Sequence, residues 1–307
     1  MRLLVTGGAG FIGSHYVRTL LSGGYPGYED AEVTVLDKLT YAGNSANLDP
    51  VSGHFTFVRG DICDAGLLAD LLPGHDAVVN FAAETHVDRS IAGAAEFVTA
   101  NVAGVQVLMD ACRNAGVGKV VHVSTDEVYG SIAEGSWTED SPLDPNSPYA
   151  AAKAGGDLIA LAYARTHGLD VSITRCCNNY GPCQYPEKVI PLFATNLLDG
   201  KPVPLYGDGG NVRGWIHVDD HCRGVGDVET GTGELGDLLA SGCQQGGEVT
   251  AEHPAGPRDQ PPSHDPSPPL AGCAGGAGRS RGSHHWRLSA YQAMVALRPS
   301  GNGMRGA

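Results

Sequence analysis

The 307-residue sequence lacks the features of several classes of protein. It has no run of about 18 apolar residues, so it predicts no membrane-spanning helix. Basic residues are scarce, 20 against 34 acidic ones, which argues against nucleic-acid binding through a broad basic surface. The eight cysteines form no Cys-x-x-Cys motif, and the chain is too long to need disulfide staples. We therefore expect reduced thiols in a cytoplasmic protein. The first residues lead directly into the segment LLVTG, which predicts a strand and not a signal peptide.

The last part of the sequence, 226–307, is deficient in large apolar residues. It holds 16 Gly and 8 Pro but no Ile, Phe or Lys. Pro removes a hydrogen-bond donor and fixes φ, so 254–269 is expected to form neither a helix nor a central strand. The few apolar side chains can hardly offset the entropy of ordering. We expect a disordered tail, or one produced by a shifted reading frame in a GC-rich gene, with at most short helices near 235–241 and 289–297.

Before this tail, β-branched runs alternate with amphipathic segments. Strands are expected at 3–6, 33–37, 55–60, 77–81, 119–124 and 171–175, and helices at 12–21, 95–114 and 149–167. This order predicts an α/β fold of the Rossmann type, a doubly wound parallel sheet covered by helices on both faces.

A glycine-rich loop joins the first expected strand to the first expected helix. Gly7, Gly10 and Gly13 let the chain turn tightly, approach a pyrophosphate and pack the helix against the strand. The helix N-terminus supplies amides to the phosphates. Asp37 ends the second strand, where a carboxylate binds a ribose 2′-hydroxyl and repels a 2′-phosphate, so NAD is favoured over NADP. The residues that end the third and fourth strands are expected beside the adenine or elsewhere along the cofactor: Asp61, Ile62, Phe81, Ala82 and Ala83.

Tyr149 and Lys153 lie four residues apart at the start of a predicted helix, so they share one face. An ammonium stabilises a phenolate, so Lys153 is expected to lower the pKa of Tyr149 toward neutrality. Tyr149 could then take a hydroxyl proton while hydride leaves the same carbon. Downstream of a dinucleotide loop, this pair is typical of the extended short-chain dehydrogenase/reductase superfamily.

Two adjacent carboxyl groups follow the fifth expected strand in the motif TDEVYG, which begins at Thr125. In such sheets, ligands bind beyond the carboxyl ends of the strands. Asp126 and Glu127 could therefore divide the work, one as a protonated acid and the other as an ionised base. A solvated loop is the alternative interpretation of this motif alone.

Residues 1–224 closely resemble the dTDP-glucose 4,6-dehydratases of deoxysugar and antibiotic biosynthesis. The motifs that carry the resemblance are TGGAGFIGS, LDKLTYAGN, GDI, NFAAETHVDRSI, STDEVYG, SPYAAAKA, RCCNNYGPCQYPEKVIP, PLYGDG and NVRGWIHVDD. Enzymes of this family oxidise the sugar at C4 with NAD, eliminate water across C5–C6 and return the same hydride to C6. The product is dTDP-4-keto-6-deoxyglucose.

The resemblance implies a role for each catalytic residue. Tyr149 would be the base for C4 oxidation, and Lys153 would hold the nicotinamide ribose. Thr125 would bond the sugar near O4, Asp126 would protonate the departing C6 hydroxyl, and Glu127 would remove the C5 proton.

The resemblance also implies which residues bind the ligands. Those expected along NAD, besides the residues named above, are Phe11, Ile12, Lys38, Leu39, Thr40, Thr99 and Asn179. Those expected along the nucleotide-sugar are Thr85, Asn178, Lys188, Val189, Pro204, Tyr206 and Arg213. Lys188 and Arg213 are cations that suit a diphosphate.

The resemblance implies an NAD-binding Rossmann domain at 1–175, the start of a smaller nucleotide-sugar-binding lobe at 176–225 and the atypical tail at 226–307. Compared with the family, this C-terminal substrate lobe is incomplete. A homodimer through the helices at 95–114 and 149–167 is expected, as is usual in the family. No metal site is expected, because the cluster of His217, Asp219, Asp220 and His221 has no evident partner ligands.

Two other functions remain open from the sequence. The first is another nucleotide-sugar enzyme of the same superfamily, such as a 4-epimerase or a dehydratase of UDP- or GDP-sugars. The second is a catalytically inactive partner that keeps NAD but lacks the substrate lobe. The acid–base pair argues against an epimerase, which performs no C5–C6 elimination.

Overall fold

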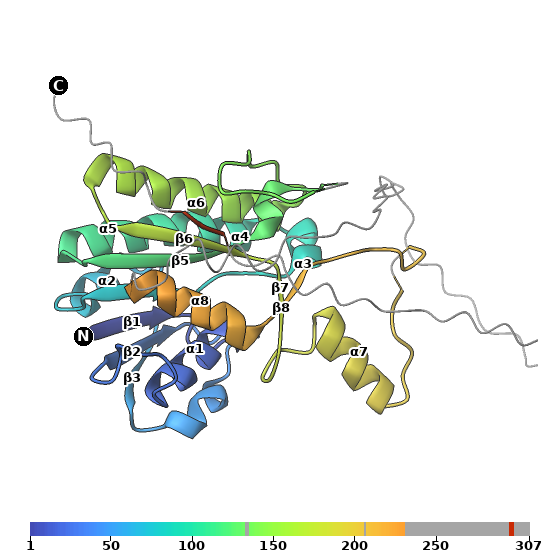
Figure 1. Ribbon diagram of the computed structural model, residues 1–307, viewed down its shortest axis with the longest axis horizontal. Coiled ribbons are helices and arrows are strands. Elements are labelled where there is room, and N and C mark those ends of the chain that lie inside the picture. The colour runs from blue at the N-terminus through green and yellow to red at the C-terminus, as the bar shows by residue number, and fades with distance from the viewer. Residues whose placement is uncertain (133–134, 206, 231–294, 298–307) are drawn as a thin grey trace, which may run out of the picture.

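The computed structural model describes residues 1–132, 135–205, 207–230 and 295–297 (Figure 1). Its main sheet has the strand order β3-β2-β1-β4-β5-β6-β9, and all neighbours from β3 to β6 are parallel. The strands are β1 (Arg2–Thr6), β2 (Glu32–Asp37), β3 (Phe55–Arg59), β4 (Ala77–Asn80), β5 (Lys119–Thr125) and β6 (Val171–Cys176). The doubly wound parallel sheet predicted from the sequence is confirmed.

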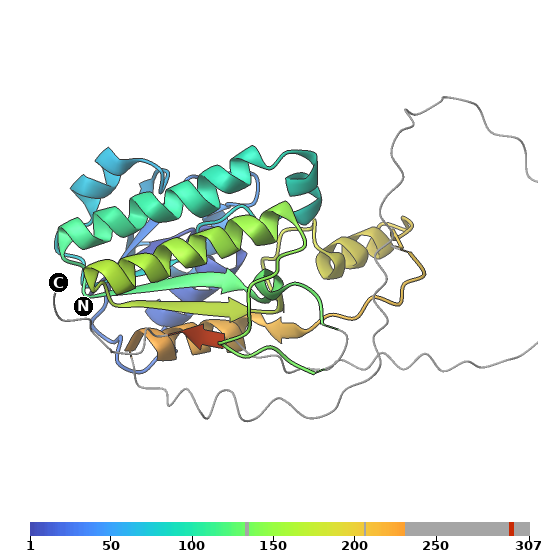
Figure 2. The same ribbon diagram turned by 90° about the horizontal axis from the view of Figure 1, so that it is seen from above.

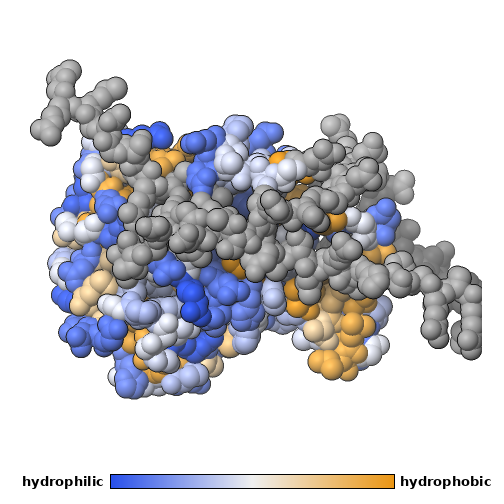
Figure 3. Space-filling view, in the orientation of Figure 1, coloured by the Kyte–Doolittle hydropathy of each residue, from blue (hydrophilic) through white to orange (hydrophobic). Residues whose placement is uncertain are grey.

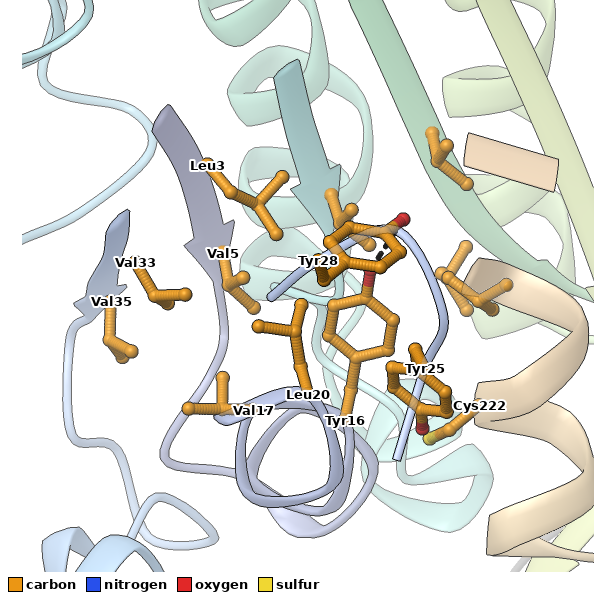
Figure 4. Packing of buried hydrophobic residues seen from close by; sticks show 14 of the residues in the cluster. Leu3, Val5, Tyr16, Val17, Leu20, Tyr25, Tyr28, Val33, Val35 and Cys222 are labelled. Atoms are coloured by element: carbon orange, nitrogen blue, oxygen red, sulfur yellow. Dashed lines mark hydrogen bonds between the residues drawn. The ribbon is translucent and has the colours of Figure 1, made fainter. Parts of the chain in front are cut away.

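Helices cover both faces of this sheet, because side chains alternate along each strand. Leu3 and Val5 point to one face and share a core with residues of α1 (Phe11–Leu21) and α8 (Val218–Thr230) (Figure 4). Leu4 points to the other face, toward α2 (Ala65–Leu71), α5 (Gly104–Ala115) and α6 (Pro148–His167). Figure 2 shows α5 and α6 side by side on one side of the sheet and α8 on the other.

The helix expected at 95–114 is interrupted in the structure. α4 (Ala95–Val98) passes through a π-helical segment, η2 (Thr99–Ala103), into α5. α6 packs closely against this π-helical segment. A Cβ at Gly156 would lie only 2.4 Å from the Asn101 carbonyl oxygen. This close approach depends on tertiary packing, which the apolar pattern of a single helix does not reveal.

The tail was expected to form at most short helices, and this is wrong where the structure describes it. Val295–Leu297 forms a strand, β9, antiparallel to β6, within the range 289–297 where a short helix was allowed. The pairing satisfies backbone groups along the otherwise open edge of β6. α8 continues to Thr230, the last described residue before 295. The expected helix at 235–241 and the Pro-rich stretch at 254–269 lie outside the described residues.

A smaller group of elements lies beyond the carboxyl ends of the main strands (Figure 1). β7 (Asn178–Tyr180) and β8 (Trp215–His217) form a two-stranded parallel sheet, and α7 (Val189–Leu198) follows β7. Apolar side chains of α7 are exposed, and Figure 3 shows the corresponding hydrophobic surface at the lower right. The remaining short elements are η1 (Ser45–Val51), α3 (Val87–Ala92) and η3 (Asp126–Tyr129). No helix among the described residues is long and apolar enough to cross a membrane.

Candidate active site

The predicted cofactor and catalytic residues gather at one edge of the sheet, where parallel strands present their carboxyl ends. The glycine loop follows β1, Asp37 ends β2, Phe81 follows β4 and Thr125 ends β5. This edge is where doubly wound sheets bind their ligands.

Two glycines of the loop, Gly7 and Gly13, have no room for a side chain. Gly7 has φ +67°, and a Cβ there would lie 2.6 Å from the Ala82 backbone nitrogen. A Cβ at Gly13 would lie 2.4 Å from the Gly7 carbonyl oxygen. Gly10 is the N-cap of α1 and provides no side-chain hydrogen bond, so the first-turn amides, including those of Phe11 and Ile12, are left for an outside acceptor. This backbone cradle fits a pyrophosphate.

Asp37 holds the cradle in place from the end of β2. Its carboxylate accepts hydrogen bonds from the Ala9 amide at 2.9 Å and the Leu39 amide at 2.8 Å. The neighbouring Lys38 pairs with Asp61 at 2.7 Å. A carboxylate has about four acceptor positions, so two remain on Asp37 for ribose hydroxyls. The residues present therefore fit NAD.

The other residues expected along NAD differ in how they are placed. Ile62 is buried in the core formed with α2 and α5, and Phe81 packs on Tyr16 with ring centroids 5.4 Å apart. The Thr99 hydroxyl donates to the Ala95 carbonyl oxygen at 2.9 Å. The Asn179 side chain donates to the Cys177 carbonyl oxygen at 3.0 Å. These groups all have structural contacts of their own, and Phe81 is only partly buried.

The Tyr–Lys pair lies in the first turns of α6, which Ser147 caps by accepting the Ala150 amide at 3.1 Å. Tyr149 and Lys153 are both buried, and the Lys153 ammonium donates to the Val123 carbonyl oxygen at 2.7 Å. Burial, and next the Glu127 carboxylate, hold the pKa of Tyr149 well above its usual value. The predicted lowering of this pKa is therefore wrong for the protein alone. The Tyr149 phenol is buried and lies near the Glu127 carboxylate, and both effects disfavour its ionised form. The hydrogen bond to Thr125 opposes the shift only in part.

The adjacent carboxyl groups lie on the short helix η3, directly after β5. Thr125 caps this turn by accepting the Glu127 amide at 3.2 Å. Burial, and next the Glu127 charge, raise the pKa of Asp126 to about 7. Burial also raises the pKa of Glu127, but the Lys188 and Arg213 cations oppose it. Asp126 is thus suited to donate a proton near neutral pH and Glu127 to accept one, as the sequence suggested.

The raised pKa of Asp126 has a consequence for stability. A carboxyl that titrates near pH 7 in the fold and near 3.8 when unfolded destabilises the fold increasingly from about pH 4 to pH 7, and constantly above. The Asp126→Asn variant should therefore unfold at a higher temperature than wild type at pH 8, with a gain that vanishes near pH 4. Thermal melts across this range test it. A gain independent of pH would show that the charge is not responsible.

Two cations lie near the carboxyl pair. The Lys188 ammonium donates to the Thr85 carbonyl oxygen at 2.7 Å, and its pKa is lowered by burial. Arg213 donates to the Val212 carbonyl oxygen at 2.8 Å and acts on both carboxyl groups. The Asn178 amide donates to the Gly214 carbonyl oxygen at 3.3 Å. The other predicted sugar-binding residues are more open or not described: Val189 and Pro204 are exposed, and Tyr206 lies outside the described residues.

Two contacts that shape this edge went unnoticed in the sequence. Asn101 is buried in the π-helical segment and exchanges hydrogen bonds with the backbone of Glu84, at 3.0 and 2.9 Å. Glu187, next to Lys188, faces the Tyr41 hydroxyl, His86 and Arg89 at 3.3, 3.7 and 3.8 Å. A polar Asn within an apolar helical segment was the only available signal for the first contact.

In the cluster that was considered as a metal site, His221 and Asp219 make contacts within the fold. His221 is buried, and its Nδ1 lies 2.8 Å from the Asn179 side-chain oxygen. Asp219 lies 3.3 Å from His15. Among the described residues, no group of three or more His, Cys, Asp or Glu side chains is placed to hold a metal ion.

The family model described as NAD dependent epimerase/dehydratase family matches residues 3–226. The chain belongs to this family. A dTDP-glucose 4,6-dehydratase of Streptomyces niveus is 63% identical over 227 residues, which are 73% of this chain and 68% of the relative. One from Streptomyces antibioticus is 65% identical over 231 residues, 75% of this chain and 69% of the relative. The resemblance stated from the motifs is confirmed.

Solved structures of family members agree. The crystal structure of the dTDP-glucose 4,6-dehydratase DesIV from Streptomyces venezuelae, with NAD and dTDP bound, matches with a TM-score of 0.73 and 70% identity. The match covers 74% of this chain and 71% of that one. A UDP-glucose 4-epimerase from Thermotoga maritima matches with a TM-score of 0.66 and 33% identity, over 73% and 71% of the two chains. Both matches place this chain among nucleotide-sugar enzymes of the family, and the dehydratase is the more similar.

Proposed function

We propose that this chain is an NAD-dependent dTDP-glucose 4,6-dehydratase that forms dTDP-4-keto-6-deoxyglucose. The observation that carries the proposal is the half-buried carboxyl pair, Asp126 and Glu127, next to the Tyr149 phenol at the ligand-binding edge. The relatives named above that carry this activity are more than 60% identical to this chain. Such a product belongs to deoxysugar biosynthesis, including that of antibiotics.

NAD would be held by the glycine cradle, Asp37 and the Lys38–Asp61 pair. When bound, it supplies the transient oxidation of C4 and the later reduction of C6. The buried Lys153 ammonium adds a positive charge beside the cofactor edge. NAD is bound in the similar structure of the Streptomyces venezuelae enzyme.

The protein's own groups move the protons. Tyr149 would accept the proton of the C4 hydroxyl as a phenolate, a form that the Lys153 ammonium and the positive charge of bound NAD would stabilise. Thr125 helps to orient that hydroxyl. Once C4 is a ketone, the C5 proton is acidic and Glu127 removes it. Asp126 donates its proton to the C6 hydroxyl, which leaves as water. When C6 is reduced, Glu127 returns its proton to C5. The proton that Tyr149 took from O4 then balances the one that Asp126 gave to the departing water, and its transfer from Tyr149 to Asp126 resets the site.

We also propose a cytoplasmic homodimer that forms through α5 and α6. Support comes from Leu158 on α6, which is 57% exposed although it is a large apolar residue. Two such helices from each copy would give a four-helix interface.

A product assay tests the proposed function. Purified protein is incubated with NAD and dTDP-glucose, and the product is treated with alkali, in which the 4-keto sugar absorbs in the near ultraviolet. We expect this absorbance together with loss of water in the mass of the product. An isomer of unchanged mass would indicate an epimerase, and no product would indicate an inactive NAD-binding partner. Either result would contradict the proposal.

Lys188 provides a pH-dependent test of the base. Removing its charge in Lys188→Met should raise the pKa of Glu127, so the acidic limb of the kcat profile should move to higher pH. KM for dTDP-glucose should rise about tenfold through loss of a charge-assisted contact. The matched control is Lys201→Met, because Lys201 is exposed and pairs with Asp199 at 2.8 Å. An unshifted acidic limb would show that Lys188 does not act on the base.

A further inference from the structure

An ion pair is completely buried beneath the acid–base turn. Asp157 is 0% exposed and Arg175 is 3% exposed. The Arg175 Nε donates to Asp157 Oδ2 at 2.8 Å. The other carboxylate oxygen of Asp157 lies 3.6 Å from His122 Nε2, which is also fully buried. The pair joins β6 to α6 inside the protein.

Arg175 makes a second contact that reaches the catalytic turn. Its Nη1 donates to the Tyr129 hydroxyl at 2.7 Å. Tyr129 is the last residue of η3, the same turn that begins with Asp126 and Glu127. Its buried ring stacks on Trp137 with centroids 5.7 Å apart. One guanidinium therefore connects the end of the catalytic turn to a carboxylate on α6.

Asp157 shares a helix face with the other catalytic pair. Tyr149, Lys153 and Asp157 follow one another at intervals of four residues along α6, so they form one row. The hydrogen bonds from Asp157 through Arg175 to Tyr129 tie η3 to that row. The acid–base turn is thus fixed relative to the helix that carries the Tyr–Lys pair.

The cost of this arrangement argues for a geometric role. Burying two charges loses several kcal/mol of hydration per ion, and well-packed apolar residues often replace such pairs without loss of stability. Arginine has a planar fork that can bond two partners in fixed directions, which lysine lacks. Here the two directions lead to Asp157 and Tyr129.

We propose that Asp157, Arg175 and Tyr129 form a positioning clamp that holds Asp126 and Glu127 at the sugar. The proposal rests on the dehydratase function proposed above. None of the three residues takes part in proton transfer; they are positioning residues that act through the turn. The clamp should therefore affect elimination more than oxidation at C4, which depends on Tyr149.

The variant Tyr129→Phe tests the clamp with little risk to folding, because it keeps the ring on Trp137 and removes only the hydroxyl. The matched control is Tyr163→Phe. Tyr163 lies on the same helix as Asp157, and its hydroxyl accepts a hydrogen bond from the Gln106 side chain at 3.3 Å. In single turnovers with dTDP-glucose, Tyr129→Phe should slow elimination about 10- to 100-fold. Reduced NAD should then accumulate, with KM nearly unchanged. Tyr163→Phe should behave as wild type.

Crystal structures of wild type and Tyr129→Phe give a second readout that needs no activity. We expect η3 to be displaced in the variant and α6 to be unchanged. Equal slowing of oxidation and elimination, or an unmoved turn, would overturn the clamp. If the wild-type protein forms no keto sugar, the proposed function fails, and the position of η3 alone then decides for or against the clamp.

Discussion

Replacing Glu127 by Gln is expected to abolish water elimination while NAD still binds. Gln keeps the size of the side chain but cannot accept the C5 proton. Loss of a positioned general base typically costs about 10²–10⁴-fold in rate. Oxidation at C4 relies on Tyr149 and should continue, so reduced NAD should accumulate. Removing the Glu127 charge should even favour that step, because this charge raises the pKa of Tyr149.

Stopped-flow absorbance of reduced NAD and quantification of the keto sugar measure the two steps separately. The matched control is Glu96→Gln, because Glu96 is an exposed glutamate on α4 with no proposed role in the chemistry. The control should turn over at the wild-type rate. Unchanged turnover of Glu127→Gln would refute its role as the base.

The second large effect is expected at Gly7. In Gly7→Ala the new methyl group would collide with the backbone after β4, 2.6 Å from the Ala82 nitrogen. Gly23 provides a matched control, because its φ of +75° is similar to the +67° of Gly7 but nothing lies within 4 Å of its Cβ position. Both variants should lose about 1–2 kcal/mol of folding stability, because alanine is strained in the left-handed backbone conformation. Only Gly7→Ala should lose about 1–3 kcal/mol more through overpacking.

Gly7→Ala should also lose NAD affinity by at least about 100-fold, because the collision displaces the cradle against which the pyrophosphate must fit. Urea unfolding and NAD titration measure the two effects. Equal loss of stability and equal affinity in Gly7→Ala and Gly23→Ala would show that the close approach of the loop to β4 has no importance.

The sequence predicted the parallel strands of the main sheet, β1 to β6, within one residue at their ends. The reason is that buried parallel strands are short runs of apolar residues, as at Leu3–Val5, and each is bounded by polar or glycine-rich turns. The cradle was also predictable, since glycines at fixed spacing between a strand and a helix have few other uses. Asp126 and Glu127 stood out because they directly follow a buried strand.

Features set by long-range packing were not predictable in this way. The π-helical segment depends on how closely α6 approaches Asn101, and β9 depends on an open edge that only the folded sheet presents. The pKa of Tyr149 was predicted in the wrong direction because the spacing to Lys153 is visible in sequence, whereas burial and the facing Glu127 are not. The Asp157–Arg175 pair joins residues 18 apart in the chain, which no local pattern connects.

The central claim is that one site oxidises C4, expels water and reduces C6. An isotope experiment tests it most directly. The purified protein would receive dTDP-glucose that carries deuterium at C4, and the product would be examined by NMR and mass spectrometry. We predict dTDP-4-keto-6-deoxyglucose with the deuterium at C6. A keto sugar that has lost its label to the solvent, or recovery of a sugar that still holds its oxygen at C6, would contradict the account.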